Sequence, residues 1–307
     1  MDLRQLSSFV GIAESGSLTR ASTKVWRSQS ALSRQLQELE QELGVALFER
    51  QARGLQLTDA GRWVLERSRQ LLKDADALKA NAAAIGTEPT GVLTVGAPPS
   101  LRPMLVAGFA AAFTRAHPKV RLQLREGTSR SMRDALARGD LDLAILSTLE
   151  PVDEFRRFPL LDEAVCLVGP PQARLSMRKP TPVSALKDRP LVLTPYPNSL
   201  RQIVDTTLAD LGVASAPVAE ADMVAMMLDL VRRGVGFTVL AYCAVHEGLT
   251  THYVSASPLR GLRIAWVVCQ SRERPETAAI RAARQALFET ARAQLKAGVW
   301  KTAREAG

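Results

Sequence analysis

The sequence predicts a mixed α/β protein, with an N-terminal unit of short helices, one long helix, and then two lobes of alternating strands and helices. Three observations lead to this fold class. Apolar residues recur at helical spacing up to about residue 43, a seven-residue apolar repeat runs to residue 85, and strand and helix patterns alternate after residue 91. The 307 residues are enough for two or three domains of roughly 100–200 residues each.

Composition and cysteine usage exclude several classes of protein. Hydrophobic residues make up 46% and charged residues 23% of the chain, which excludes collagen-like and disordered proteins. No apolar run approaches the ~20 residues of a membrane span and the N-terminus lacks a signal-peptide pattern, so we expect a cytoplasmic protein. Cys166, Cys243 and Cys269 lie far apart among apolar residues, which favours reduced, buried thiols over disulfides.

The first two helices are predicted from an apolar face and a stop signal. Four residues follow the i, i+3, i+4, i+7 spacing of one helix face: Leu6, Phe9, Val10 and Ala13. Gly16 is expected to end this helix, and Ser17 to cap a second helix over residues 18 to about 25.

A third helix is expected to begin after Ser28, a favoured N-cap residue, and to end at Gly44. Its apolar stripe consists of four leucines: Leu32, Leu36, Leu39 and Leu43. The opposite side of the helix is polar and carries Ser30, Ser33, Arg34, Gln37 and Gln41.

Two helices joined by a tight turn, with a polar outer face, predict a helix-turn-helix that binds DNA. Gln and Arg can make paired hydrogen bonds to base edges, and the first turns of such a helix enter the major groove. Residues 15–37 hold no acid and four cations: Arg20, Lys24, Arg27 and Arg34. The alternative is a small helical subdomain with a solvated polar face, and this placement of charge favours DNA. Arg50 and Arg53 follow in a loop, residues 50–54, that we expect to be a β-wing contacting phosphates or the minor groove.

A long helix is expected from residue 58 to about 85, a stretch with one early glycine and no proline. At ~1.5 Å per residue it would be roughly 40 Å long. Four apolar residues recur every seven positions: Val64, Leu71, Leu78 and Ile85. Such a repeat favours a partner helix and hence a dimer, and the alternative is packing on its own domain.

The remaining two thirds alternate between strands and helices. We expect strands at 92–97, 120–125 and 141–146 with helices at 100–116 and 129–137, an order that implies parallel strands. A second set has strands at 164–169, 191–193, 217–219 and 237–240 with helices at 199–211 and 223–232; a strand at 262–269 and a helix at 276–296 follow. The expected domains are 1–58, 59–90 and 91–307, the last with lobe I at about 91–162 and 267–300 and lobe II at about 163–266.

Four helix starts in these lobes are candidates for a ligand site, because ligands of such folds bind at the carboxyl ends of strands. Helix N-termini favour anions, and Arg102, Arg130 and Arg201 lie near three of the starts. We therefore predict a small, acidic effector. Its candidate contacts are Ser100, Leu101, Thr128, Ser129, Pro197, Asn198 and Met223. The alternative for each residue is that the polar side chain only caps its helix and the arginine is solvated.

Catalysis finds no support in the sequence. Walker A, HExxH, CxxC and GxSxG strings are missing, and the three histidines have no ligand spacing. We expect no enzyme activity, no metal and no cofactor besides the effector. A redox sensor would need a reactive thiol with a nearby resolving partner, whereas Cys166 and Cys269 fall in apolar predicted strands, which favours inert burial.

The first 90 residues resemble the DNA-binding domain of the LysR-type transcriptional regulators. The matching strings are LxxF (6–9), GSLTRA (16–21), SQSALS (28–33), LQELE (36–40), LG (43–44), LFER (47–50) and LTDAG (57–61). The resemblance implies that Gln29, Ser33 and Arg34 contact DNA. It also implies that Arg50 and Arg53 belong to the contacts made with the DNA backbone and by the wing. It departs at Ser30, where the family usually has proline, and at Arg27, where a small apolar residue or Thr is usual. Ser28 and these two residues complete the candidate DNA contacts.

The later residues are similar to the family's effector domain, whose fold is like that of periplasmic solute-binding proteins. GDLDLAI (139–145) and VRRGVG (231–236) carry this similarity. The resemblance implies a homodimer through the long helix, often assembled into a tetramer, and a bacterial regulator of promoter DNA. GAPPS (96–100), EG (126–127), PLVL (190–193) and SLR (199–201) are similar to a subgroup named for nitrogen assimilation control. The alternatives are a constitutive regulator without effector, or a solute-binding protein or enzyme on the two-lobe fold.

The formal charge of +9 is not concentrated in the DNA-binding part. Residues 1–90 hold 12 basic and 11 acidic residues, whereas residues 91–271 hold 20 and 16 and residues 272–307 hold 8 and 4. The predicted DNA signal is therefore local: residues 15–37 carry +4.

Overall fold

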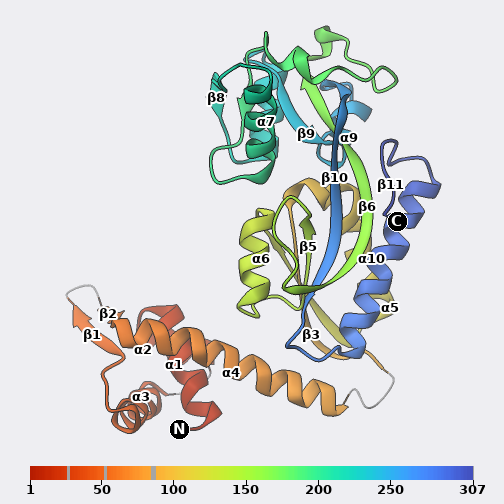
Figure 1. Ribbon diagram of the computed structural model, residues 1–307. Coiled ribbons are helices and arrows are strands. Elements are labelled where there is room, and N and C mark those ends of the chain that lie inside the picture. Colours follow the sequence, from red (N-terminus) through yellow and green to blue (C-terminus); the bar gives the residue numbers. More distant parts are fainter. Residues whose placement is uncertain (26–27, 52–53, 84–87, 307) are drawn as a thin grey trace. The chain divides into compact units, whose positions relative to one another are not determined.

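The chain folds into two units, Met1–Ile85 and Gly86–Gly307, each with its own hydrophobic core. A computed structural model describes residues 1–25, 28–51, 54–83 and 88–306 (Figure 1).

The first unit is a set of short helices with a two-stranded wing and one long helix. Its elements are α1 (Leu3–Ser15), α2 (Leu18–Val25), α3 (Gln29–Leu43), β1 (Phe48–Gln51), β2 (Gly54–Leu57) and α4 (Asp59–Ala83). The Ala31 N–H donates to Ser28 Oγ at 3.3 Å, so Ser28 caps α3 as predicted. Gly16 and Gly44 end α1 and α3 with φ of 63° and 70°, which glycine adopts without strain.

The core of this unit is built from the predicted apolar stripes. Leu32, Leu36 and Leu39 are buried together with Leu6 and Phe9. The expectation that Leu43 completes the stripe is wrong, because it is the last residue of α3 before the chain turns, and 36% of it is exposed. Packing one face of α3 leaves its polar face in solvent.

The predicted wing is confirmed as a hairpin in which β1 pairs antiparallel with β2, Phe48 opposite Leu57 and Arg50 opposite Leu55. The expected loop is shorter than residues 50–54, because positions 50, 51 and 54 belong to the strands. Arg53 lies outside the described residues.

The predicted long helix is α4, whose seven-residue repeat faces two environments. Val64 packs partly against the core of the unit, whereas Leu71 and Leu78 are 46% and 70% exposed. Ile85 lies outside the described residues. The outer half of the repeat therefore presents apolar side chains to solvent in the isolated chain.

The second unit begins with the predicted alternation of strands and helices. Its elements to the middle of the unit are β3 (Gly91–Ala97), η1 (Pro99–Leu101), η2 (Arg102–Val106), α5 (Ala107–Ala116), β4 (Val120–Glu126), α6 (Ser129–Ala137), β5 (Leu143–Ser147), β6 (Phe155–Gly169), η3 (Pro171–Ala173) and η4 (Val183–Leu186). The remainder are β7 (Val192–Leu193), α7 (Ser199–Asp210), β8 (Ala219–Glu220), α8 (Val224–Arg232), β9 (Thr238–Ala241), α9 (Tyr242–Thr250), β10 (Ser255–Ser271), α10 (Ala278–Lys296) and β11 (Arg304–Glu305). The helix expected at 100–116 is divided into a 3₁₀ turn, a π turn and α5.

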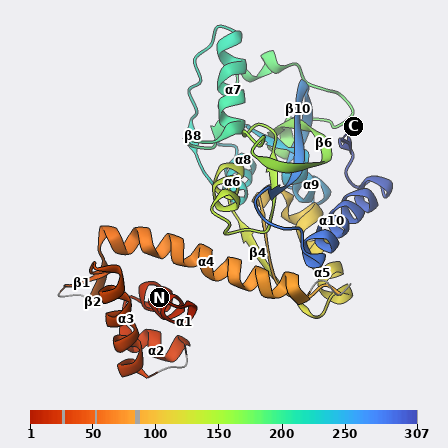
Figure 2. The same ribbon diagram turned by 60° about the horizontal axis from the view of Figure 1, so that its bottom comes forward.

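Seven of the described strands of this unit form one sheet in the order β11-β6-β10-β5-β3-β4, with β9 also paired to β6, and β7 and β8 form a separate parallel pair. Strand β3 is parallel to β4 and β5, as the sequence predicts, whereas β10 is antiparallel to both β5 and β6. Strands β6 and β10 run side by side along the length of the unit (Figures 1 and 2). The chain passes from one predicted lobe to the other in these two strands.

Alternate residues of the strands face opposite layers of helices. Leu143 and Ile145 belong to the large core with α5 and α10, whereas Ala144 and Leu146 pack with α6. This is the two-residue period expected of a sheet covered on both faces.

The bounds of two strands expected in this unit need correction, and one helix is additional to those expected. The strand predicted at 164–169 begins already at residue 155, and the strand predicted at 262–269 extends from 255 to 271. Charged residues such as Arg156 and Asp162 interrupt the apolar run and hid the first half of β6. Helix α9 was not predicted, because it follows β9 directly and its N-cap residue Ala241 makes no side-chain hydrogen bond.

A buried carboxylate joins three segments at the middle of β6. Glu163 is 0% exposed and accepts hydrogen bonds from Trp266 Nε1 at 2.6 Å, Trp300 Nε1 at 2.8 Å and the Cys243 N–H at 2.9 Å. The donors come from β10, the segment after α10 and the first turn of α9. Burial raises the pKa of Glu163, and the three donors oppose that rise.

We expect Glu163→Ala to lower the free energy of unfolding by more than about 3 kcal/mol, because each of three buried donors left without an acceptor costs ~1–3 kcal/mol. Glu163→Gln should cost less, since one amide oxygen remains. Urea unfolding of the full chain followed by circular dichroism measures both. The control Glu305→Ala removes a carboxylate that is 62% exposed and should change stability by less than about 0.5 kcal/mol. A Glu163→Ala cost as small as that of the control would contradict the assignment.

Candidate functional site

The first two turns of α3 present a polar surface. Ser28, Gln29, Ser30 and Arg34 are exposed and Ser33 is half-buried. Ser28 is also the helix cap, and its Oγ lies 3.2 Å from Ser30 Oγ. The structure thus brings together five of the eight predicted DNA contacts on one helix.

Arg34 has a partner on its own helix. Its Nε donates to Glu38 Oε1 at 2.9 Å, and the two side chains are 81% and 43% exposed. A pair this exposed stabilises a helix by only about 0.3–0.5 kcal/mol. Phosphate or a base edge could therefore replace Glu38 at small cost.

The other three predicted DNA contacts are not placed in the same way. Arg27 and Arg53 lie outside the described residues, and Arg50 belongs to β1.

At the start of α6, both predicted effector contacts hold the chain together. The Ser131 N–H donates to Thr128 Oγ1 at 3.1 Å, so Thr128 caps the helix. Ser129 is buried, and its Oγ accepts from the Ser147 N–H at 3.2 Å, which ties α6 to the end of β5. The capping alternative considered for Thr128 is thus observed.

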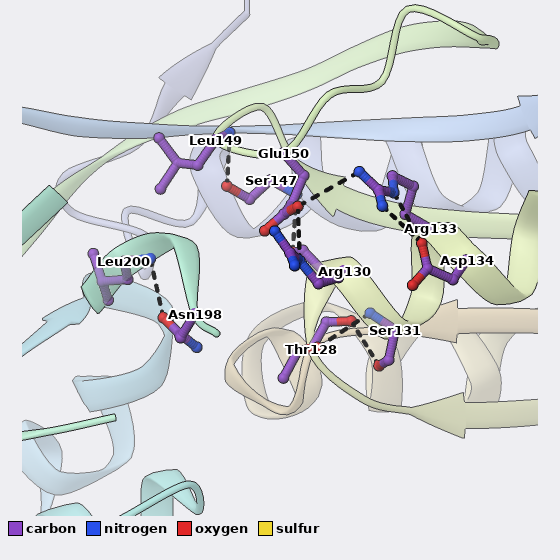
Figure 3. A network of polar contacts seen from close by, with 11 residues as sticks. Thr128, Arg130, Ser131, Arg133, Asp134, Ser147, Leu149, Glu150, Asn198 and Leu200 are labelled. Atoms are coloured by element: carbon purple, nitrogen blue, oxygen red, sulfur yellow. Dashed lines mark hydrogen bonds and ion pairs between the residues drawn. The ribbon is translucent and has the colours of Figure 1, made fainter. Parts of the chain in front are cut away.

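Next to this cap lies an acid between two arginines. Glu150 is 5% exposed, 3.7 Å from Arg130 Nε and 3.8 Å from Arg133 Nη1. Figure 3 shows both arginines turned toward Glu150, with Asn198 on a separate segment. Arg130 is therefore not simply solvated, since an acid of its own chain faces it.

At the start of α7, the cap and the arginine are also engaged. Asn198 Oδ1 accepts from the Leu200 and Arg201 N–H groups at 3.0 and 3.1 Å. The Arg201 side chain is 7% exposed, pairs with Asp205 and Glu220, and lies 4.9 Å from the Tyr196 ring centre. Pro197 follows Tyr196 through a cis peptide bond. The alternative that Arg201 is solvated is therefore wrong, and its charge is balanced within the fold.

The remaining helix starts meet at a cavity of about 440 Å³. Ser100 and Met223 both line it, whereas Leu101 is buried in the core and its N–H donates to the Pro98 carbonyl at 3.0 Å. Met223 is 62% exposed and its side chain makes no hydrogen bond to α8. Thr128, Ser129 and Asn198 are not among the residues that line this cavity.

The sequence missed the wall that α9 contributes to the cavity. Ala244, Glu247 and Gly248 line it, and they could not be assigned without predicting α9. Glu126 and Asp222 also line it. Glu126 follows a predicted strand and Asp222 precedes a predicted helix, so the sequence pattern could have identified both as candidate site residues.

The three cysteines are free and buried, as predicted. Burial raises the pKa of Cys166 and Cys243, and it raises the pKa of Cys269 to about 12. Within the described part of the chain, no group of three or more His, Cys, Asp or Glu side chains could hold a metal ion, and no helix there is long and apolar enough to cross a membrane.

The helix-turn-helix and the two-lobed domain define a class, that of DNA-binding regulators with a ligand-binding domain. Comparison with known families makes the assignment specific. The family described as "Bacterial regulatory helix-turn-helix protein, lysR family" matches residues 3–62, and "LysR substrate binding domain" matches residues 86–292. The chain belongs to the LysR family of transcriptional regulators, and like its relatives it is a regulator, not an enzyme.

Individual relatives and solved structures agree with this. The regulator BbuR of Bordetella bronchiseptica is 27% identical over 302 residues, which cover 98% of this chain and 93% of that protein. A probable hydrogen peroxide-inducible genes activator of Streptomyces viridosporus is 32% identical, over 86% of each chain. A full-length OxyR variant of Pseudomonas aeruginosa has the same fold, with a TM-score of 0.71 at 23% identity, covering 95% of this chain and 98% of that one.

We expect Arg34→Ala to weaken DNA binding and to lower the slope of log affinity against log salt by roughly 0.9, because one phosphate or base contact by a cation is lost. Glu38→Gln should strengthen binding, since it frees Arg34 and removes a negative charge beside the DNA. Fluorescence anisotropy with promoter DNA at several salt concentrations measures both. Arg292→Ala, in the second unit, is the control and should change neither quantity. Equal slopes for Arg34→Ala and the unaltered protein would contradict the contact.

Proposed function

We propose that the start of α3 reads promoter DNA in the major groove through Gln29, Ser33 and Arg34. The observation that carries this is the exposed, acid-free first half of the polar face of α3, opposite a buried leucine stripe. The other candidate residues are proposed to contact DNA phosphates or to form part of the wing: Arg27, Ser28, Ser30, Arg50 and Arg53.

We also propose that α4 is the dimerisation helix. Leu71 and Leu78 are exposed apolar residues of a seven-residue repeat, and burial against a second α4 would cover them. Val64 and Ile85 are the other positions of this proposed contact. A two-fold symmetric pair would bind two half-sites of a pseudo-palindrome, and two such dimers would form a tetramer.

The second unit is proposed to sense a small molecule that shifts the arrangement of subunits on promoter DNA. The proposed lobes are 91–162 with 267–300, and 163–266. In the sequence they follow a proposed DNA-binding domain at 1–58 and a linker helix at 59–90. The candidate contacts are the helix starts named above: Ser100, Leu101, Thr128, Ser129, Pro197, Asn198 and Met223. A regulator of chromosomal promoters acts in the cytoplasm, which we propose as its location.

A second candidate, peroxide sensing, is suggested only by the names of relatives such as the Streptomyces viridosporus activator. Such sensing needs an accessible thiolate. The buried cysteines with raised pKa values favour the small-molecule effector instead.

Gel shifts with the DNA upstream of the protein's own gene test the DNA-binding proposal. We expect Gln29→Ala to weaken specific binding by roughly tenfold or more, because a paired contact with a base contributes ~1–3 kcal/mol of discrimination. Gln41→Ala is the matched control, since Gln41 is exposed on the last turns of the same helix and should have no effect. Equal weakening by both substitutions would refute the proposed orientation of α3.

Thiol labelling tests the redox alternative. In the folded protein at neutral pH, we expect all three cysteines to react with a disulfide reagent at less than about one tenth of the rate of free cysteine, because burial disfavours the thiolate. Guanidinium-unfolded protein is the control and should release three equivalents. One fast-reacting thiol in the folded protein would favour peroxide sensing over a small-molecule effector.

A further inference from the structure

The cavity between η1, α8 and α9 has a lining that specifies the charge of its ligand, an inference that rests on the proposed sensing function. Its volume of about 440 Å³ is within the ~300–1,000 Å³ of small-molecule sites. Part of the wall is apolar and consists of Pro99, Pro103, Met223, Val224, Leu228 and Ala244. This wall can accommodate the hydrocarbon body of a small ligand.

The charged side chains that line the cavity are mostly acidic. Four carboxylates belong to Glu126, Asp222, Asp229 and Glu247, and the one guanidinium that the described residues contribute to the lining belongs to Arg102. The second unit as a whole carries excess positive charge. The negative lining is therefore a local feature that general composition does not explain.

Most of these carboxylates are not engaged by the protein. Asp229 accepts a hydrogen bond from the Tyr253 hydroxyl and lies 3.6 Å from Arg232. Within the described part of the chain, the Glu126, Asp222 and Glu247 carboxylates have no hydrogen bond or ion pair. They differ in this from Glu150 and Asp205, which face arginines elsewhere in the unit.

Two features oppose this charge. The N-terminus of α8 carries a partial positive charge of about half a unit and has no side-chain cap, and Arg102 adds one full charge. Both together remain smaller than the charge of three unpaired carboxylates. An acidic ligand would be repelled, whereas a cation would gain hydrogen-bond acceptors from the Glu126, Asp222 and Glu247 carboxylates, which are exposed to solvent.

We propose that this cavity binds a small organic amine, whose ammonium group is held by Glu247, Glu126 and Asp222 and whose apolar body lies against Met223, Val224 and Leu228. The ligand would bridge the segment around η1 and β4, in proposed lobe I, to α8 and α9 in proposed lobe II. It would then favour the arrangement of the lobes that closes the cavity. This replaces the acidic effector expected from the helix starts with one of opposite charge.

Isothermal titration of the full chain with 2-phenylethylamine, putrescine, 3-phenylpropionate and 2-phenylethanol tests the charge of the ligand. We expect at least one of the two amines to bind with a dissociation constant below about 1 mM, and the carboxylate and alcohol to show no saturable binding. Absence of binding by both amines, or tighter binding of the carboxylate, would overturn the proposal.

Substitutions then locate the site. The double variant Glu126→Gln/Glu247→Gln should weaken amine binding at least about tenfold, which is the effect of losing a hydrogen bond to a charged group. Glu289→Gln, an exposed residue of α10 outside the lining, is the matched control and should bind as tightly as the unaltered protein. Amine binding that the double variant retains in full would place the ligand elsewhere and overturn the proposal.

The outcome is separable from that of the DNA-binding proposal. Gel shifts without amine are run on the same variants and should be unchanged, because the cavity residues belong to the second unit. Failure of amine binding with intact gel shifts would reject only the cavity, whereas normal DNA binding by Gln29→Ala would reject only the orientation of α3.

Discussion

The hydrogen bonds to the buried Glu163 carboxylate are the constraint on which the arrangement of the second unit depends. Burying a carboxylate is unfavourable unless donors replace its hydration, and here three donors come from three different segments. All three segments must be in place at once for the carboxylate to be satisfied. One of them is the first turn of α9, whose partial positive charge also favours a nearby carboxylate. Because α9 forms a wall of the cavity, the geometry of the cavity depends on this contact.

The same rule, that buried charge must be balanced, distinguishes residues that hold the fold together from residues that can bind DNA or a ligand. Arg201 is near a helix start but is already paired with Asp205 and Glu220, and Ser129 is bonded to the end of β5. Polar residues without such partners are left for recognition. They include Gln29 on the exposed face of α3 and the Glu126, Asp222 and Glu247 side chains of the cavity, whereas Arg34 is held only by an exposed pair with Glu38.

Local signals made much of the fold predictable from sequence. Helix α3 begins at its cap Ser28, and Gly16 and Gly44 end α1 and α3, by interactions within a few residues. Helix α6 begins and ends where its cap and apolar spacing predict. Long-range pairing was harder, because charged positions in β6 are satisfied by residues far along the chain, as Asp162 is by Arg263. Helix α9 lacks a capping side chain and depends on Glu163, 80 residues away. The α9 wall of the cavity was missed for this reason.

Net charge illustrates why the site could be predicted only in part. A chain of +9 suggests nucleic acid and acidic ligands, yet each candidate site has a charge set by a few nearby residues. Around α3 the acid-free stretch of 15–37 agrees with that suggestion, although its total domain charge is almost neutral. In the cavity the local charge has the opposite sign to the unit that surrounds it. Since a ligand in a small cavity interacts most strongly with groups within a few ångströms, the lining, and not the composition, determines which ligand binds.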